Sequence, residues 1–355
     1  MDNSTRSAKL NHCVNQYHRV RPHFPQPPEI MLPTIRAELL FLPDNEPLRF
    51  LPEGPYALGN GKFSWVGIQH GASATHGSIN VFDLNSRTNQ SYELPGRPGF
   101  ARPTSVEGTF IVGCERELGL FDINSRTWKP LASGIDSDVS NTIINDGTIY
   151  GDNIVFGTKD LEFKTKKAGL YLYRGHDGAL IRLRNDQICS NGKDIVDSGH
   201  GGLHLYDIDT PTKRVVRYRL DIKLGTLADC ETVIDLTDLE SFPDGMCLTP
   251  DEQSTIISFY NPNPAEFGET RQYNLISGEL ERIWLTANSP QVTCPLLIED
   301  HAGSVKLVIT TAVEHMPAAR RSDSPLAGAL FIAETHFTTA PPAPQFPMAG
   351  LKLPK

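Results

Sequence analysis

An eight-residue segment occurs twice in the first third of this chain, and the repeat limits the possible folds more than any other feature. Val81-Phe-Asp-Leu-Asn-Ser-Arg-Thr recurs 39 residues later as Leu120-Phe-Asp-Ile-Asn-Ser-Arg-Thr. In both copies two apolar residues lead into Asp, Asn and Ser, which favour tight turns over regular structure. Each copy therefore predicts a β-strand, a turn and the start of a second strand.

Four weaker copies of this pattern follow along the chain. They begin at Gly169, Lys213, Arg271 and Gly328. Six hairpins over about 310 residues correspond to about 50 residues each, the length of a four-stranded propeller blade. We therefore expect an all-β fold, a six-bladed β-propeller with four-stranded blades over residues 36–355. The alternative, a double β-sandwich, does not explain a hairpin repeated at the spacing of blades.

The start of the chain differs in composition from the rest. Residues 1–35 are polar and dotted with proline, and we interpret them as an N-terminal arm that precedes the propeller. The run Ala37–Leu42 would supply the strand that closes the ring against the last blade. The chain contains 29 Gly and 27 Pro, and this frequency of turn-forming residues argues against long helices.

Charge and cysteine usage restrict the partners and the compartment. The net charge of −9 argues against a general affinity for nucleic acid or an anionic membrane, because both need a basic surface. No run of residues is apolar enough to cross a membrane, and the start lacks the apolar region of a signal peptide. Six widely spaced cysteines without a CxxC motif indicate neither a disulfide framework nor a zinc clamp. We expect a cytoplasmic protein, a monomer or weak homo-oligomer, with a small-molecule substrate.

Four polar residues are spaced along the chain at about blade intervals. Glu53, Asn145, Asn191 and Asp244 are separated by 92, 46 and 53 residues, or about two, one and one blade lengths. Equivalent positions in successive blades form a ring around the propeller axis, so these side chains are expected to converge at one end of the central channel. Read singly, Asn-Gly and Asp-Gly are also ordinary turn formers with no ligand role.

The predicted ring has the chemistry of a cation site. Two carboxylates on a dry axis repel each other unless a cation or a shared proton lies between them. The ring offers only oxygen donors, which select a hard cation such as Ca²⁺ or Mg²⁺ over Zn²⁺. Three protein ligands leave positions open for water and substrate, as metal-ion catalysis requires. The eleven histidines show no metal-ligand spacing. His315 is one of five that could line a rim, although the simpler interpretation of each is a surface or hydrogen-bonded histidine.

The motifs around these residues resemble a known family. Glu53-Gly-Pro, Asn145-Asp-Gly, Gly157-Thr, Ser190-Asn-Gly and Pro243-Asp-Gly-Met-Cys are similar to the regucalcin/gluconolactonase family of six-bladed propellers. The resemblance covers about residues 35–350. It implies a divalent-metal-dependent lactone hydrolase with one bound cation, Ca²⁺ first, with Mg²⁺, Mn²⁺ and Zn²⁺ as alternatives.

The resemblance also implies roles for individual residues. Glu53, Asn191 and Asp244 match the metal ligands of the family, and Asp244 also matches its general base, which takes a proton from the attacking water. Asn145 matches the amide beside the metal that contacts substrate. Glu162, just after Gly157-Thr158, aligns with an acidic substrate contact.

Two residues depart from the sugar-lactone members of the family. Ile143 stands where those members have an arginine that binds sugar hydroxyl groups. Phe100, in Pro98-Gly-Phe-Ala, is expected to add an apolar wall to the pocket. Because isoleucine offers no hydrogen bond to a hydroxyl group, we expect a relatively apolar lactone as substrate.

Three hypotheses about function remain at this stage. The first is the metal-dependent lactone hydrolase. The second is an isomerase or cyclase of natural-product biosynthesis that uses the same pocket. The third is a non-enzymatic, metal-binding propeller. Oxygen from labelled water enters the product of a hydrolase but not that of an isomerase or cyclase. A non-enzymatic propeller should still bind its partner after Glu53 and Asp244 are removed.

Overall fold

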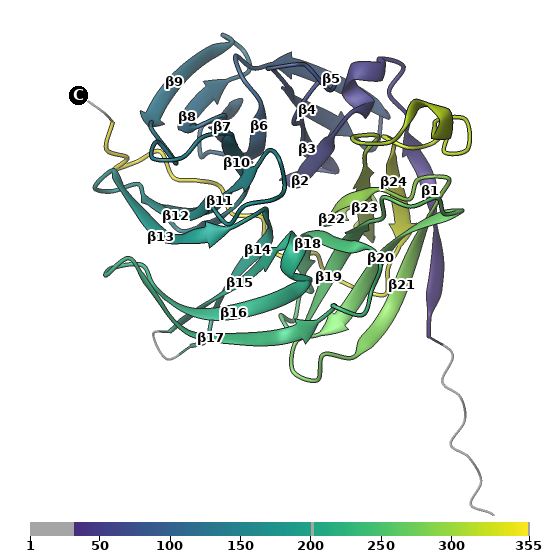
Figure 1. Cartoon of the computed structure of the whole chain (residues 1–355). Helices are drawn as coiled ribbons and strands as arrows, with labels where there is room; N and C mark the ends of the chain where they lie inside the picture. Colours follow the sequence, from purple (N-terminus) through teal and green to yellow (C-terminus); the bar gives the residue numbers. More distant parts are fainter. Residues whose placement is uncertain (1–31, 200–201, 354–355) are drawn as a thin grey trace, which may run out of the picture. The chain divides into compact units, whose positions relative to one another are not determined.

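The computed structural model describes residues 32–199 and 202–353, which form an all-β, propeller-like fold (Figure 1). Residues 1–31 of the predicted arm lie outside the described residues. Twenty-four strands form four four-stranded sheets and one eight-stranded sheet, arranged around a common centre. The only helices in the described ranges are three short 3-10 helices, η1 (Glu46–Arg49), η2 (Thr210–Thr212) and η3 (Ala318–Arg320).

The four-stranded sheets follow one another along the chain, each as an antiparallel meander. The first two consist of β2 (Pro52–Gly59), β3 (Lys62–Gly67), β4 (Ser78–Asp83) and β5 (Thr88–Glu93), and of β6 (Pro98–Pro103), β7 (Thr109–Cys114), β8 (Glu117–Asp122) and β9 (Thr127–Ala132). The next two consist of β10 (Thr142–Tyr150), β11 (Asn153–Asp160), β12 (Ala168–Arg174) and β13 (Ala179–Gln187), and of β14 (Ser190–Asp197), β15 (Leu203–Asp209), β16 (Arg214–Asp221) and β17 (Thr226–Asp235).

The eight-stranded sheet joins the two ends of the propeller. Its members are β1 (Thr34–Phe41), β18 (Phe242–Leu248), β19 (Ser254–Tyr260), β20 (Phe267–Asn274), β21 (Leu280–Ala287), β22 (Val292–Glu299), β23 (Val305–Thr311) and β24 (Leu330–Glu334). The first half of β1 pairs with β21 in parallel, and its second half pairs with β24 in antiparallel orientation. The described strands therefore form five sheets and not six separate ones, because β1 links the four strands β18–β21 to the three strands β22–β24.

The repeated segment of the sequence forms the same hairpin in two sheets. Asp83 ends β4, and its Oδ1 atom accepts hydrogen bonds from the backbone N–H groups two and three residues later, at 2.8 and 3.2 Å. Asp122 ends β8 and accepts the equivalent pair of bonds, both at 2.8 Å. Arg87 and Arg126 complete the two turns with φ angles of 53° and 58°. The predicted order of strand, tight turn and strand is confirmed at both places, in the outer half of each sheet.

Large apolar side chains fill the spaces between neighbouring sheets. Phe100 of β6 and Phe156 of β11, for example, pack with their ring centroids 6.1 Å apart in a core cluster. Trp65 and Trp284 are fully buried in two other clusters. This packing holds the inner strand of each sheet in place around the centre.

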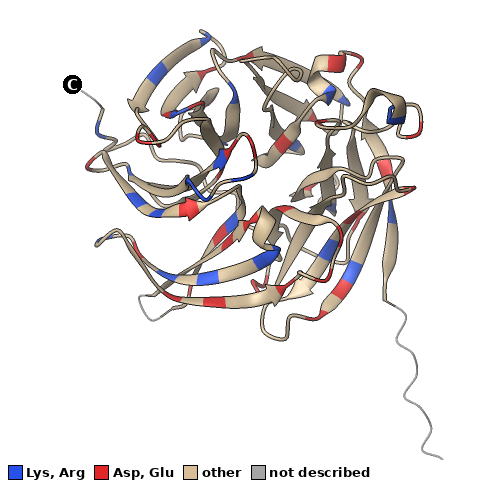
Figure 2. Ribbon diagram, in the orientation of Figure 1, with Lys and Arg blue, Asp and Glu red and all other residues tan. Residues whose placement is uncertain are grey.

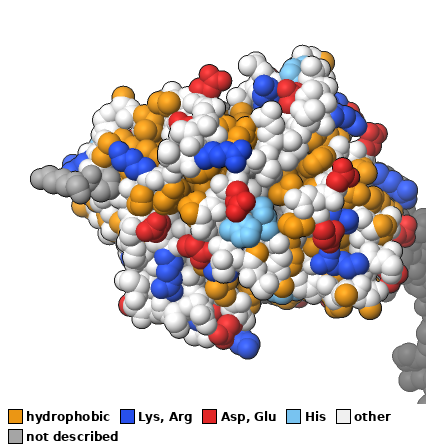
Figure 3. Space-filling model, turned by 90° about the horizontal axis from the view of Figure 1, so that it is seen from above, with side chains coloured by type: hydrophobic (Ala, Val, Ile, Leu, Met, Phe, Trp, Pro, Cys, Tyr) orange, Lys and Arg blue, Asp and Glu red, His pale blue; other side chains and the backbone are white. Residues whose placement is uncertain are grey.

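The surface carries charges of both signs. The outer strands β16 and β17 face each other with basic and acidic side chains (Figure 2), and Arg217 and Glu231 form one such pair at 2.5 Å. Seen from above, hydrophobic, acidic and basic side chains are interspersed (Figure 3). None of the helices in the described part of the chain is long and apolar enough to cross a membrane.

Candidate active site

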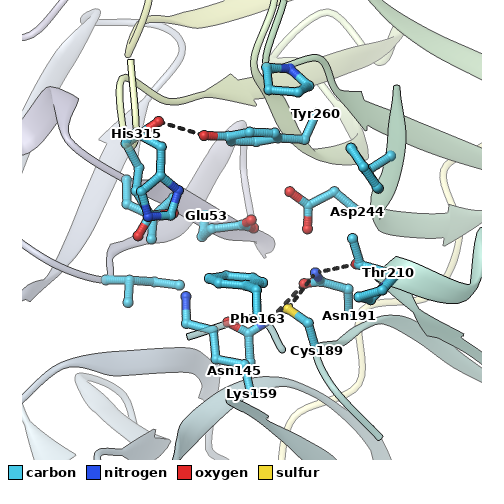
Figure 4. A pocket seen from close by; sticks show the side chains of 16 residues that line it. Glu53, Asn145, Lys159, Phe163, Cys189, Asn191, Thr210, Asp244, Tyr260 and His315 are labelled. Atoms are coloured by element: carbon cyan, nitrogen blue, oxygen red, sulfur yellow. Dashed lines mark hydrogen bonds and ion pairs between the residues drawn. The ribbon is translucent and has the colours of Figure 1, made fainter. Parts of the chain in front are cut away.

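A cavity of about 280 Å³, which we call the axial pocket, opens on the face of the propeller where the innermost strands begin. The side chains that line it come from residues just before or within the first strands, and from the ends of the second strands and the loops that follow them. Its polar lining residues are Glu53, Asn145, Lys159, Asn191, Thr210, Asp244, Glu314 and His315 (Figure 4).

All four residues of the predicted ring line this pocket. Glu53 lies on β2, Asn145 on β10, Asn191 on β14 and Asp244 on β18, so each comes from the innermost strand of a different group of four. Each residue is no more than 9 % exposed. The carboxylates of Glu53 and Asp244 point into the same space, with the two amides below them in the view of Figure 4.

Irregularities in strand register turn these side chains toward the axis. The pairing of β10 with β11 skips Asn145, the pairing of β14 with β15 skips Asn191, and the pairing of β18 with β19 skips Asp244. A β-bulge at such a position leaves a residue unpaired and redirects its side chain, and bulges are frequent beside active sites. Glu53 is still paired with Val66 and immediately precedes the bulge in β2.

Gly192 and Gly245, which follow Asn191 and Asp244, are required by close packing at the axis and not by turns. A Cβ atom on Gly245 would lie 2.5 Å from the Sγ atom of Cys294, on the neighbouring inner strand. A Cβ atom on Gly192 would lie 2.7 Å from the side chain and backbone of Met246. Asn-Gly and Asp-Gly therefore belong to strands here, although the same dipeptides are common in turns.

A chain of hydrogen bonds fixes the orientation of both amides. Asn145 donates from Nδ2 to the carbonyl oxygen of Ser190 at 2.9 Å and to Oδ1 of Asn191 at 2.7 Å. Asn191 donates from Nδ2 to the hydroxyl of Thr210 at 2.7 Å, and that hydroxyl donates to the carbonyl oxygen of Pro243 at 2.9 Å. Because the two carbonyl oxygens can only accept, the direction of every bond is determined. The Oδ1 atom of Asn145 is thereby left as an acceptor.

Both carboxylates of the ring have a raised pKa. Burial raises the pKa of Glu53 to about 8, with the charge of Asp146 as the second cause. Burial, followed by the charge of Glu53, raises the pKa of Asp244 well above its usual value. Two buried acids that resist ionisation together are what a bound cation would neutralise.

Arg102 lies directly behind the ring. It donates to the carbonyl oxygen of Gly147 at 2.6 Å and to that of Gly54 at 3.3 Å, and its Nη2 atom is 3.4 Å from a carboxylate oxygen of Asp146. Arg102 also lines a separate cavity of about 120 Å³ together with Tyr56 and Asp146. The axial pocket is thus backed by a buried positive charge.

Three predicted substrate contacts need correction, because they do not line the axial pocket. Phe100 is fully buried in the core beside Phe156, since the bulge in β6 leaves Gly99 unpaired and Phe100 paired. Ile143 is 1 % exposed and lies outside the pocket lining. Glu162 is exposed, accepts a hydrogen bond from Asn141 at 3.1 Å and is not part of the pocket lining.

The structure adds polar and aromatic residues that the sequence analysis missed. Lys159 reaches into the pocket from the end of β11, and Tyr260 contributes its ring from the end of β19 (Figure 4). Phe163 and His315 meet edge to face at the mouth, with ring centroids 5.9 Å apart. Lys159 follows the apolar run Ile154–Gly157 after a single residue, and a lysine at the end of a buried strand was a signal that could have predicted a pocket residue there. The contact of Phe163 with His315 joins loops 152 residues apart and left no local signal.

The loop that carries Phe163 is held by one buried carboxylate. Asp160 accepts hydrogen bonds from three backbone N–H groups of residues 162–165, at 2.9 to 3.1 Å, and pairs with the Lys167 ammonium at 2.9 Å. Burial raises the pKa of Asp160, but the bond with Lys167 and the backbone bonds outweigh it and lower the pKa to about 2. The ionised form therefore stabilises the loop.

We expect Asp160→Asn to lower the free energy of unfolding by about 2–3 kcal/mol at pH 7, because bonds to a charged acceptor are lost. A group with a lowered pKa stabilises the fold above its unfolded pKa of about 4 and loses this effect as the pH falls toward 2. The difference between wild type and variant, measured by urea unfolding at pH 7, 4 and 3, should shrink with the pH. The exposed neighbour provides the control: Glu162→Gln should change stability by less than about 0.5 kcal/mol. An Asp160→Asn protein as stable as wild type contradicts the assignment.

Comparison with known proteins decides the family. The sequence model described as SMP-30/Gluconolactonase/LRE-like region matches residues 51–313, a span that contains all four residues of the ring. The chain belongs to this family.

Relatives of this SMP-30/Gluconolactonase/LRE-like chain include a bacterial protein named "Putative sugar lactone lactonase YvrE" from Bacillus subtilis (strain 168). The two are 29 % identical over 189 residues, which cover 53 % of this chain and 60 % of YvrE. The chain therefore spans less than two thirds of the length of this relative.

Solved structures with this fold include regucalcin, a calcium-binding protein from Agrobacterium tumefaciens str. C58. Its TM-score is 0.71 at 20 % identity, and the match covers 88 % of this chain and 99 % of regucalcin. A gluconolactonase from Xanthomonas campestris has a TM-score of 0.55 at 14 % identity, with coverage of 80 % and 86 %. At these identities the similarity shows a common fold.

Proposed function

We propose that this member of the SMP-30/Gluconolactonase/LRE-like family is a lactone hydrolase whose active site is the axial pocket. The observation that carries the proposal is the convergence of two buried carboxylates and two oriented amides from four different inner strands in one cavity. The names of YvrE and of the Xanthomonas campestris gluconolactonase add support.

We propose further that the hydrolase depends on one divalent cation, Ca²⁺ before Mg²⁺, Mn²⁺ or Zn²⁺. The donor set fits a hard cation, because Glu53, Asn191 and Asp244 would hold it through oxygen atoms. Within residues 32–199 and 202–353, no group of three or more His, Cys, Asp or Glu side chains is placed to hold a metal, and the third donor of the proposed site is the amide of Asn191. When bound, the cation would polarise the lactone carbonyl and offset the repulsion between the two acids.

The chain's own residues provide the proton transfer and the positioning. Asp244 lines the pocket, and in its ionised form it would accept the proton of the attacking water. Asn145 is held by two donated hydrogen bonds, and its Oδ1 atom accepts a hydrogen bond from that water or from a substrate hydroxyl. The Asn191 amide is locked between Asn145 and Thr210, so its oxygen is positioned before any ligand enters.

The substrate we propose is a relatively apolar lactone. The support no longer comes from Ile143 and Phe100 but from the residues that line the pocket. Leu51, Ile68, Phe163, Phe242 and Tyr260 form most of its apolar wall. A polyhydroxylated lactone would leave hydroxyl groups without partners against these side chains.

The remaining details of the architecture are also proposals. We propose that β18–β21 form the fifth blade, and that β22–β24 completed by β1 form the sixth. The five cysteines of the described ranges are free thiols, which is compatible with the cytoplasm. We keep the monomer or weak homo-oligomer as the proposed assembly.

Hydrolysis in ¹⁸O-labelled water tests the proposed reaction. We expect one ¹⁸O atom in the carboxylate of each product molecule, measured by mass spectrometry. With a set of lactones, kcat/KM for aromatic or alkyl lactones should exceed that for gluconolactone by about 10- to 100-fold, since each unpaired hydroxyl is worth about 1–3 kcal/mol. An isomerised or cyclised product without label supports the isomerase or cyclase instead. Failure to convert any lactone supports a binding protein.

A further inference from the structure

The proposed chemistry gives no role to Lys159, the lysine that lines the axial pocket. Its side chain lines the pocket although the residue is only 5 % exposed. Among the described residues its ammonium makes no hydrogen bond and no ion pair within 4 Å. The ammonium lies 5.9 Å from the ring centroid of Phe163. An ammonium without a protein partner is free to bind an anionic group that enters the pocket.

The backbone of Lys159 is held on both sides. It pairs with Ile143 on β10, and it forms an isolated bridge with Cys189 ahead of β14. Directly opposed residues of an antiparallel pair project from the same face of the sheet. Ile143 and Lys159 therefore project from the same face of the sheet. Of the two, only Lys159 is part of the pocket lining.

The register also gives the depth of Lys159 in the pocket. Ile143 precedes Asn145 by two residues, which is a displacement of about 6–7 Å along the strand. Because β10 begins at the pocket face and runs inward, this displacement is toward the mouth. The backbone of Lys159 thus lies nearer the mouth than the ring does, and its side chain reaches the pocket beside Phe163 (Figure 4).

If Lys159 served only as a counter-ion of the ring, its ammonium should form an ion pair with Glu53 or Asp244. The charge of Lys159 lowers the pKa of both Glu53 and Asp244, so the two acids are within its field. Neither acid forms a direct ion pair with Lys159, however, and the ammonium keeps its hydrogen-bonding capacity for another group. An anionic group is the partner that such a donor binds most strongly.

We propose that Lys159 binds a carboxylate carried by the substrate, so that the pocket selects lactones with an apolar body and an acidic group several ångströms from the ester. The proposal rests on the lactone-hydrolase function proposed above, and it names the substrate class of that same pocket. Lys159 then determines specificity, and it takes no part in the proton transfer at Asp244.

Binding of a simple probe pair tests the lysine independently of catalysis. The probes are 4-phenylbutyrate and the neutral 4-phenylbutanol, measured by calorimetry in the presence of Ca²⁺. Wild type should bind the carboxylate at least about 10-fold more tightly than the alcohol, which corresponds to about 1.4 kcal/mol. Lys159→Met should abolish this preference, whereas Lys159→Arg should retain it. The alcohol should bind all three proteins with similar affinity.

Lys164→Met is the matched control, because it removes one positive charge from the exposed part of the same loop. It should leave both affinities unchanged. The proposal is overturned if wild type does not prefer the carboxylate, if Lys159→Met retains the preference, or if Lys164→Met loses it to the same extent.

Kinetics separate this proposal from the proposed reaction. For a lactone with a remote carboxylate and its methyl ester, Lys159→Met should lower kcat/KM for the acid by about 10- to 100-fold and for the ester by less than about 3-fold, as expected for one lost charged contact. Equal losses for acid and ester contradict selection by Lys159. If neither lactone is hydrolysed, the proposed reaction fails, and the probe pair still decides the role of Lys159.

Discussion

Replacing Asp244 with Asn is expected to lower the turnover of lactones by about 10³-fold, within the range observed for removal of a general base. The same substitution should raise the stability of the cation-free protein, because it removes a buried charge that faces Glu53. Loss of activity with gain of stability distinguishes a functional carboxylate from a structural one. Steady-state kinetics and urea unfolding in EDTA measure the two effects.

Asp194→Asn provides the control for this experiment. Asp194 is a partly buried carboxylate that lines the cavity behind Arg102, and burial raises its pKa to about 6. Its replacement should leave turnover within about 2-fold of wild type, because it does not line the axial pocket. An Asp244→Asn protein with more than a tenth of wild-type turnover contradicts the role of Asp244.

Removing divalent cations with EDTA is expected to abolish turnover, and Ca²⁺ is expected to restore it. Binding to the folded state alone also stabilises the fold, by about 2.7 kcal/mol when the cation is at 100 times its Kd. Thermal unfolding between 0 and 10 mM Ca²⁺ measures this effect. Parallel titrations with Mg²⁺, Mn²⁺ and Zn²⁺ test the alternatives.

The ligand assignment predicts which variants lose the response to Ca²⁺. Glu53→Gln should remove most of the calcium-dependent rise in Tm, because a charged oxygen donor becomes a neutral one. Glu314→Gln is the matched control, since Glu314 lines the same pocket but is not among the predicted ligands. Full activity of the EDTA-treated protein, or an unchanged calcium response in Glu53→Gln, contradicts the proposed cation site.

Much of the fold could be predicted because its signals are local. Asp83 and Asp122 bond to backbone groups two and three residues away, so the hairpins are encoded within eight residues. Their recurrence at blade length then predicts a propeller-like fold. The junction at β1 was predicted only in part. That strand pairs with β24 as expected, but its first half also pairs with β21, and nothing in Thr34–Ala37 alone distinguishes the two neighbours.

The residues of the candidate site were also predicted only in part. The spacing of Glu53, Asn145, Asn191 and Asp244 predicts that they meet, and the structure places all four in the axial pocket. Ile143 was predicted as a substrate contact from the family resemblance and Phe100 from its place in Pro98-Gly-Phe-Ala, and neither lies in the pocket. A strand alternates its side chains between two faces, so a bulge that skips one residue decides which neighbour points inward.

The sequence by itself determined the hairpin repeat, the family and the oxygen-rich set of residues near the axis, because each depends on residue types at regular spacing. Only the tertiary structure decided which side chains face the pocket. The bulges of β6 and β10, the bridge of Lys159 to Cys189 and the contact of Phe163 with His315 all depend on strands and loops that are distant in the chain. Such contacts form through packing between sheets, and packing leaves no periodic pattern in any one segment.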